Sequence, residues 1–218
     1  MMPPFSAEQF FDVFVAYNEA VWPAHVVAYA LGLAALLAAA RGGRGASAFV
    51  ATALAAFWAW NGAVYHIGFF AAVNTAAYAF GALFVVQAGL FAYAGLVRRR
   101  LAFRLPRDGY GLAGAALVLY ALAIYPLLGT TFGHGYPSNP AFGLAPCPTT
   151  IFTLGLLLWT ERAVPKAVLV IPAFWALIGF TAALQLGVYE DTGLLVAVLV
   201  SVGMLLYRNR RRPALAST

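Results

Sequence analysis

Residues 97–107 read VRRRLAFRLPR, and this basic segment separates two long apolar stretches of the chain. All thirteen Lys and Arg residues fall in alternate gaps between such stretches, and five of the seven carboxylates lie at the N-terminus or in the other gaps. Cytoplasmic loops of membrane proteins are enriched in Lys and Arg, so the pattern predicts a multi-pass protein. The basic residues are Arg41, Arg44, Arg98, Arg99, Arg100, Arg104, Arg107, Arg162, Lys166, Arg208, Arg210, Arg211 and Arg212.

The composition also indicates a membrane-embedded chain. It is 63% hydrophobic and 9% charged, with a mean hydropathy of +0.84, far outside the range of soluble domains. A net charge of +6 would suggest nucleic acid as the partner of a soluble protein. Here contact with anionic lipids accounts for the charge, so we expect a lipid bilayer and no nucleic acid as partner.

Seven apolar stretches approach the roughly 20 residues that a helix needs to cross a bilayer. We therefore predict an all-α membrane bundle of seven transmembrane helices in a single domain covering residues 1–218. The charge pattern predicts an orientation with the N-terminus outside and the C-terminus cytoplasmic. The expected spans are about 20–40, 47–70, 75–97, 110–129, 148–160, 164–185 and 191–207.

The stretch 148–160 is short, which leaves six spans with a re-entrant 141–160 as the alternative. Arg162 and Lys166 disfavour it, because they would then lie on the acidic outer side. Pro126 and Pro172 fall inside spans and predict kinks.

The two ends of the chain have patterns of their own. Ser6 and Gln9 have the spacing of a capping box, which predicts an amphipathic interfacial helix over residues 6–19. Phe5 and Phe10 have the spacing of a hydrophobic staple beside it. The last residues, 208–218, are expected to form a basic tail beyond the final span.

Most of the unusual polar residues collect at the predicted outer end. Ionisable side chains within spans are costly and suggest a functional site. For Asn61 and His66 a structural role in interhelical contacts is equally compatible, and Glu190 and Asp191 fit the lipid headgroup layer. The loop 130–147 is expected to cover this end. The candidate ligand-binding residues are Glu19, His25, Asn61, Tyr65, His66, His134, Cys147 and Thr150.

The single cysteine, Cys147, stands between Pro146 and Pro148. This pattern predicts an irregular chain until about Thr149, with the thiol facing the bundle. Thiol and imidazole groups bind soft or borderline transition-metal ions, so His66, His134 and Cys147 are candidate metal ligands. The alternative is that the prolines shape a turn around a small buried residue.

Several functions are disfavoured by residues that the sequence lacks. Its only lysine, Lys166, is at the inner end of a span, so no retinal Schiff base is available in the last helix. The His-x-x-x-His pair of seven-span zinc hydrolases is missing, although three histidines with Glu19 and Asp191 could imitate such a site.

Three segments carry a family resemblance: YNEAVWP (17–23), NGAVYH (61–66) and PCPTTIFTLG (146–155). They resemble a bacterial domain-of-unknown-function family of small multi-spanning membrane proteins, sometimes loosely labelled permeases. The resemblance implies an integral membrane protein of bacteria and no specific activity.

We therefore expect a small-solute or ion permease, or a binding protein, with a polar site open to the outside. A membrane-embedded metal-dependent enzyme and a non-catalytic accessory subunit are the alternatives. Gln87 alone is clearly polar near mid-membrane, which argues against proton-coupled transport.

Overall fold

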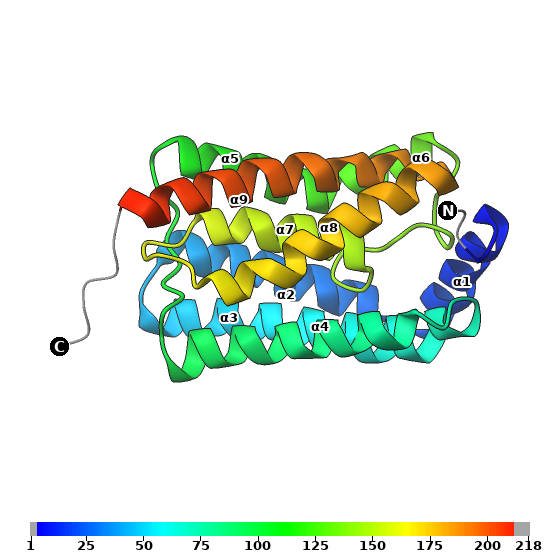
Figure 1. The fold of residues 1–218 in the computed structure, drawn as a ribbon, viewed down its shortest axis with the longest axis horizontal. Helices are drawn as coiled ribbons and strands as arrows, with labels where there is room; N and C mark the ends of the chain where they lie inside the picture. The colour runs from blue at the N-terminus through cyan, green and yellow to red at the C-terminus, as the bar shows by residue number, and fades with distance from the viewer. Residues whose placement is uncertain (1–3, 212–218) are drawn as a thin grey trace.

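The computed structural model describes residues 4–211, which form a bundle of lengthwise helices with α1 across one end (Figure 1). The helices are α1 (Ala7–Ala20), α2 (Ala24–Arg41), α3 (Arg44–Trp60) continued by η1 (Asn61–Phe69) and η2 (Phe70–Ala72), α4 (Ala77–Ala92) with η3 (Tyr93–Val97), α5 (Gly109–Leu119) with η4 (Tyr120–Ile124) and α6 (Tyr125–Thr131), α7 (Pro146–Leu158), α8 (Lys166–Leu186), η5 (Tyr189–Thr192) and α9 (Gly193–Arg211).

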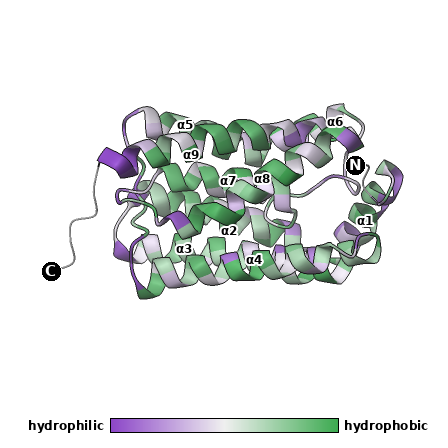
Figure 2. Cartoon of the chain, viewed as in Figure 1, coloured by the Kyte–Doolittle hydropathy of each residue, from purple (hydrophilic) through white to green (hydrophobic). Residues whose placement is uncertain are grey.

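Six helical stretches are long and apolar enough to cross a membrane. Their outward faces carry large apolar side chains, such as Leu112 and Leu199, which are 76% and 65% exposed. Figure 2 shows apolar colouring along these helices and hydrophilic segments at the end that holds the C-terminus. The six stretches are Ala24–Arg41, Arg44–Ala72, Ala77–Val97, Gly109–Thr131, Lys166–Leu186 and Tyr189–Arg211.

The seventh predicted span corresponds to α7, which has only 13 residues. Every residue from Ala141 to Thr160 is buried. Helix α7 contacts α3, α5, α8 and α9, and it runs along the middle of the bundle (Figure 1). At the end opposite α1, Arg104 N donates to Trp159 O at 2.7 Å. The segment therefore connects the two ends of the bundle from within, and a full seventh helical span stays a prediction.

Two boundaries differ from the sequence-based expectation. Helix α7 begins at Pro146, not after Thr149, because proline is well suited to the first turn of a helix. The final helix α9 continues to Arg211, so the predicted tail begins inside it. Its continuation is stabilised by Arg208, which is buried against α7, while residues 212–218 lie outside the described part of the chain.

The predicted prolines lie in two different settings. Pro126 follows the π-helical η4, a wider turn that interrupts regular α-helical hydrogen bonding before the proline. Pro172 lies inside α8, which continues through it.

A close approach of two backbones joins η1 to α4. A side-chain carbon on Gly62 would lie 2.7 Å from the carbonyl oxygen of Gly81, and one on Gly81 would lie 2.8 Å from that of Gly62. The glycines allow this contact, which favours the close-contact interpretation of Gly62.

Candidate functional site

Helix α1 begins with the interactions that the sequence predicts. Ser6 N donates to Gln9 Oε1 at 2.9 Å, and Gln9 N donates to Ser6 Oγ at 3.1 Å, which confirms the capping box. The rings of Phe5 and Phe10 stack with their centroids 6.2 Å apart. These contacts fix where the helix starts and bring its aromatic residues over the bundle.

Polar contacts fasten α1 to the long helices and to the following loop. Tyr17 Oη donates to Leu144 O at 2.8 Å and accepts from Trp60 Nε1 at 2.7 Å. Burial raises the pKa of Tyr17, so its hydroxyl stays protonated and able to donate. Asn18 Nδ2 donates to the carbonyls of Pro137 and Asn139 at 2.6 and 2.8 Å. The loop 132–145 is thus held against α1.

Two of the predicted site residues support this same loop. His25 Nε2 lies 3.1 Å from Asn18 Oδ1, and its ring meets that of Tyr136 edge-on. Asn61 Nδ2 donates to Gly143 O at 3.0 Å and to Phe57 O at 2.8 Å. These contacts favour a structural role for Asn61.

A cavity of about 180 Å³ lies between α1, α4, α8, η5 and the start of α7. Aromatic and aliphatic side chains form most of its wall, and Cys147 and Asp191 contribute polar atoms. Tyr65 also lines it, stacked between Phe14 and Phe70 with centroids 5.1 and 5.6 Å away. The lining residues are Pro4, Phe5, Phe10, Phe14, Tyr65, Phe70, Asn74, Phe80, Pro140, Pro146, Cys147, Trp175, Ile178, Gly179, Ala182, Ala183, Leu186, Val188 and Asp191.

Asp191 is the one carboxyl-bearing residue among the described residues that line this cavity. Glu190 and Asp191 were expected to face the lipid headgroup layer, but their side chains are buried inside the protein, with 0% and 3% exposure. The Asp191 carboxylate accepts a short hydrogen bond from Tyr125 Oη and lines the same cavity as the Cys147 thiol. Buried carboxylates require such donors, so the fold has built a partnered acid into an apolar wall.

Glu190 points to the other side of η5. Its Oε1 lies 3.5 Å from His134 Nδ1, close enough for an ion pair when the imidazole is protonated. The His134 ring also stacks on Phe11 of α1, with centroids 4.1 Å apart. This contact fastens the loop after α6 to α1.

His66 is buried behind the cavity wall, with 0% exposure. Aromatic rings surround it, with those of Phe84 and Trp175 centred 4.8 and 5.0 Å away. Within residues 4–211, neither ring nitrogen has a hydrogen-bond partner. His66 does not line the cavity itself, but its neighbour Trp175 does.

The remaining predicted residues are separated from this group. Glu19 is exposed on α1, and Thr150 Oγ1 donates to Pro146 O within α7. Over the described residues, no three His, Cys, Asp or Glu side chains gather in a way that could hold a metal ion. The expected metal set of His66, His134 and Cys147 is not brought together, because the three residues contact an aromatic cluster, Glu190 and Asp191 respectively.

Apart from Tyr65, the aromatic residues of the lining were not among the predicted site residues, and neither was Asp191. Phe70, Phe80 and Trp175 resemble any other lipid-facing or core side chain in the sequence. An acid at the start of the final span was the available signal for Asp191.

Comparison with known proteins adds the family of the chain. No curated protein and no solved structure matches it. The sequence matches the family described as "Family of unknown function (DUF6064)" over residues 7–216, nearly its whole length. An uncharacterised family was predicted from three short motifs, and the match extends across all three. The chain therefore belongs to this family of unknown function, DUF6064.

Proposed function

We propose that this chain is an integral membrane binding protein, which takes a small and mainly apolar molecule into the cavity beneath α1. The observation that carries the proposal is an apolar, aromatic-lined cavity with the buried carboxylate of Asp191 in its wall. Apolar pockets with few, fixed polar groups are the usual form of small-molecule sites.

The chemistry of the wall defines the class of ligand. The volume of the cavity, about 180 Å³, is similar to that of apolar cavities that hold a benzene-sized molecule, about 150 Å³. Asp191 supplies an acceptor, while Tyr125 already uses part of its capacity. A ring or short chain bearing one hydroxyl or amine fits this combination.

Binding is a better account of the site than conduction. The cavity ends at Pro146 and Cys147, the first residues of α7, and α7 is buried along the axis of the bundle. A permeation path through this axis would have to displace α7. The expected permease activity is therefore replaced in our proposal by uptake and retention at one end.

Photolabelling with a diazirine derivative of benzyl alcohol tests the cavity in lipid nanodiscs. Mass spectrometry of peptides should place adducts on Phe70, Tyr65 and Trp175, and excess phenol should suppress them. Ala182→Leu fills part of the cavity and should lower this competable labelling about tenfold, which corresponds to about 1.4 kcal/mol. Ala167→Leu adds the same side chain on the exposed face of α8 and should leave labelling unchanged.

A second variant tests whether Asp191 recognises the polar group of the ligand. Asp191→Asn keeps the shape of the wall and weakens its acceptor, so labelling by the alcohol should fall while labelling by the matching toluene derivative should not. Equal labelling of the native chain and Ala182→Leu, or adducts spread evenly over lipid-facing helices, would contradict the proposal.

We further propose that the α1 end faces the outside and the basic end faces the cytoplasm of a bacterial inner membrane, with α1 at the outer interface. This orientation is supported by the charge pattern and by the position of the basic residues at the end opposite α1.

Cysteine accessibility tests the orientation in a Cys147→Ser background. Asp12→Cys should react with a membrane-impermeant maleimide in intact cells, and Arg107→Cys only after permeabilisation, since both positions are exposed. A cysteine at position 103 would not report on accessibility, because Phe103, on the same loop as Arg107, is fully buried. Reaction of both cysteines in intact cells would contradict the proposed topology.

A further inference from the structure

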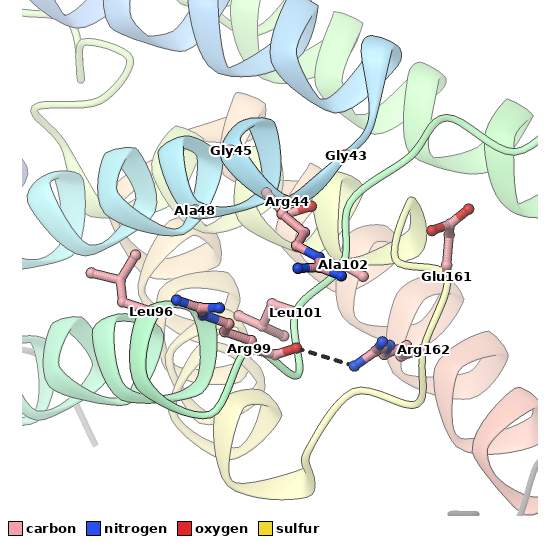
Figure 3. Close-up of a pocket in the computed structure, with 12 residues that line it drawn as sticks. Gly43, Arg44, Gly45, Ala48, Leu96, Arg99, Leu101, Ala102, Glu161 and Arg162 are labelled. Atoms are coloured by element: carbon pink, nitrogen blue, oxygen red, sulfur yellow. Dashed lines mark hydrogen bonds between the residues drawn. The ribbon is translucent and has the colours of Figure 1, made fainter.

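A second hollow of about 620 Å³ lies at the end of the bundle opposite α1, between α3, η3 and two loops (Figure 3). Its lining includes Arg44, Arg99 and Arg162, with Glu161 as the acid among the described lining residues. The Glu161 carboxylate lies 3.4 Å from Arg104, which is outside the hollow. The lining therefore carries an excess of positive charge.

The three arginines come from different parts of the chain. Arg44 is the first residue of α3, Arg99 follows η3, and Arg162 follows α7. Arg162 Nη1 donates to Arg99 O at 3.3 Å, which joins the two loops (Figure 3). The side chains of Arg44 and Arg99 extend into the hollow from opposite walls (Figure 3). Guanidinium groups match the geometry of phosphate oxygens.

Backbone donors lie beside these side chains. Helix α3 starts with no acidic residue in its first turn and no side-chain cap, so its first amides keep hydrogen-bonding capacity. The space around Gly43 and Gly45 is open, with no atom within 4 Å of an added side-chain carbon. The positive end of a helix dipole together with free amides favours an anion.

The backbone conformation of Arg99 is a third and independent feature of this hollow. Across residues 4–211, Arg99 is the one non-glycine residue with a positive φ, at 50°. This conformation is strained for an arginine and is relieved by glycine. Strained residues cluster at functional sites. A function of the Arg99 side chain explains why arginine, and not glycine, occupies this position.

We propose that this hollow binds a phosphate group, presented by an anionic phospholipid headgroup or by a free phosphate. The neighbouring Val97 is 69% exposed, as expected for a lipid-facing residue next to a headgroup. Basic pockets between membrane helices are known to hold such headgroups. The site is separate from the cavity beneath α1 and does not depend on its ligand.

Native mass spectrometry of the purified chain in neutral detergent tests the proposal, with phosphatidylglycerol, phosphatidylcholine or inorganic phosphate added. Phosphatidylglycerol should bind more tightly than phosphatidylcholine. The double variant Arg44→Gln, Arg99→Gln should weaken phosphatidylglycerol binding about 30-fold, from the usual contribution of two arginines near a phosphate. Competition by inorganic phosphate would identify the phosphate group alone as sufficient, and its failure would identify the lipid headgroup as the source.

The matched control removes the same charge outside the hollow. Arg41→Gln, Arg107→Gln should change affinity only slightly, and thermal unfolding should show that both double variants remain folded. Equal weakening by both, or equal affinity for the two lipids, would overturn the proposal.

Arg99→Gly separates binding from folding. It should raise the thermal midpoint, because it relieves the backbone, and weaken phosphatidylglycerol binding about fivefold. A folded Arg99→Gly variant with native affinity would contradict the role of Arg99 and the proposed site.

Discussion

Arg208→Met should lower the free energy of unfolding by about 3 kcal/mol or more, the largest loss expected from a single residue at the basic end. The Arg208 guanidinium donates to Leu158 O at 3.2 Å, to Thr160 O at 2.8 Å and to Thr160 Oγ1 at 2.6 Å. Leu158 ends α7 and Thr160 lies just beyond it, and both residues are buried, so loss of the guanidinium leaves three buried acceptors without their donor. Hydrogen bonds from a charged donor contribute about 1.5–3 kcal/mol each, and methionine keeps only the apolar stem.

Unfolding by sodium dodecyl sulfate in mixed micelles measures this loss. Arg210→Met removes the same charge from an exposed position two residues later in α9 and should change stability by no more than about 0.5 kcal/mol. Arg208→Lys should fall between them, because an ammonium group reproduces only part of the planar donor pattern. Equal stability of Arg208→Met and Arg210→Met would show that α7 does not depend on this cap.

Gly62→Leu should destabilise the fold by about 3 kcal/mol, and Gly62→Ala by about 1–2 kcal/mol. The added carbon would lie 2.7 Å from the backbone oxygen of Gly81, which cannot rotate away as a side chain could. Relief requires η1 to move away from α4. Because η1 carries Tyr65 and α4 carries Phe80, this movement would also separate two walls of the cavity.

Gly68→Ala is the matched control within η1, since its nearest atom would be 3.6 Å away, an ordinary contact. It should be close to neutral in the same unfolding titration. Photolabelling of the cavity should fall in Gly62→Ala and stay native in Gly68→Ala. Native stability of Gly62→Ala would mean that the two helices are not held at this contact.

The helical framework could be predicted because the hydropathy and charge of each stretch can be read directly from its own residues. Six of the seven stretches are helices of spanning length, and the capping box at Ser6 starts α1 as expected. These features depend on residues near in sequence. They need no knowledge of which helix neighbours which.

The central position of α7 could not be predicted, because it depends on which helices are its neighbours. A helix in the centre of a membrane bundle and a helix facing lipid are both apolar, so composition does not distinguish them. The complete burial of Ala141–Thr160 follows from the neighbours that α7 contacts.

Some residues of the cavity were predicted from the sequence, and others were missed. Tyr65 and Cys147 line the cavity, whereas His66 does not line it and Glu19 is exposed. Asp191 was assigned to the headgroup layer because its sequence position fits that layer. Its burial depends on Tyr125, a partner 66 residues away, which no local pattern reveals.

The complete cover around α7 has a consequence for biosynthesis. In the proposed membrane topology, α7 is synthesised before α8 and α9, so the new helix enters the membrane without two of its covering partners. Its hydroxyl groups are satisfied in advance, because each donates to a carbonyl four residues earlier in the same segment. In that topology, nascent α7 has these donors paired in an apolar setting, and Arg208 can bond to its end only after α9 has been synthesised. The three hydrogen bonds are Thr149 Oγ1 to Ala145 O at 2.7 Å, Thr150 Oγ1 to Pro146 O at 2.8 Å and Thr153 Oγ1 to Thr149 O at 2.7 Å.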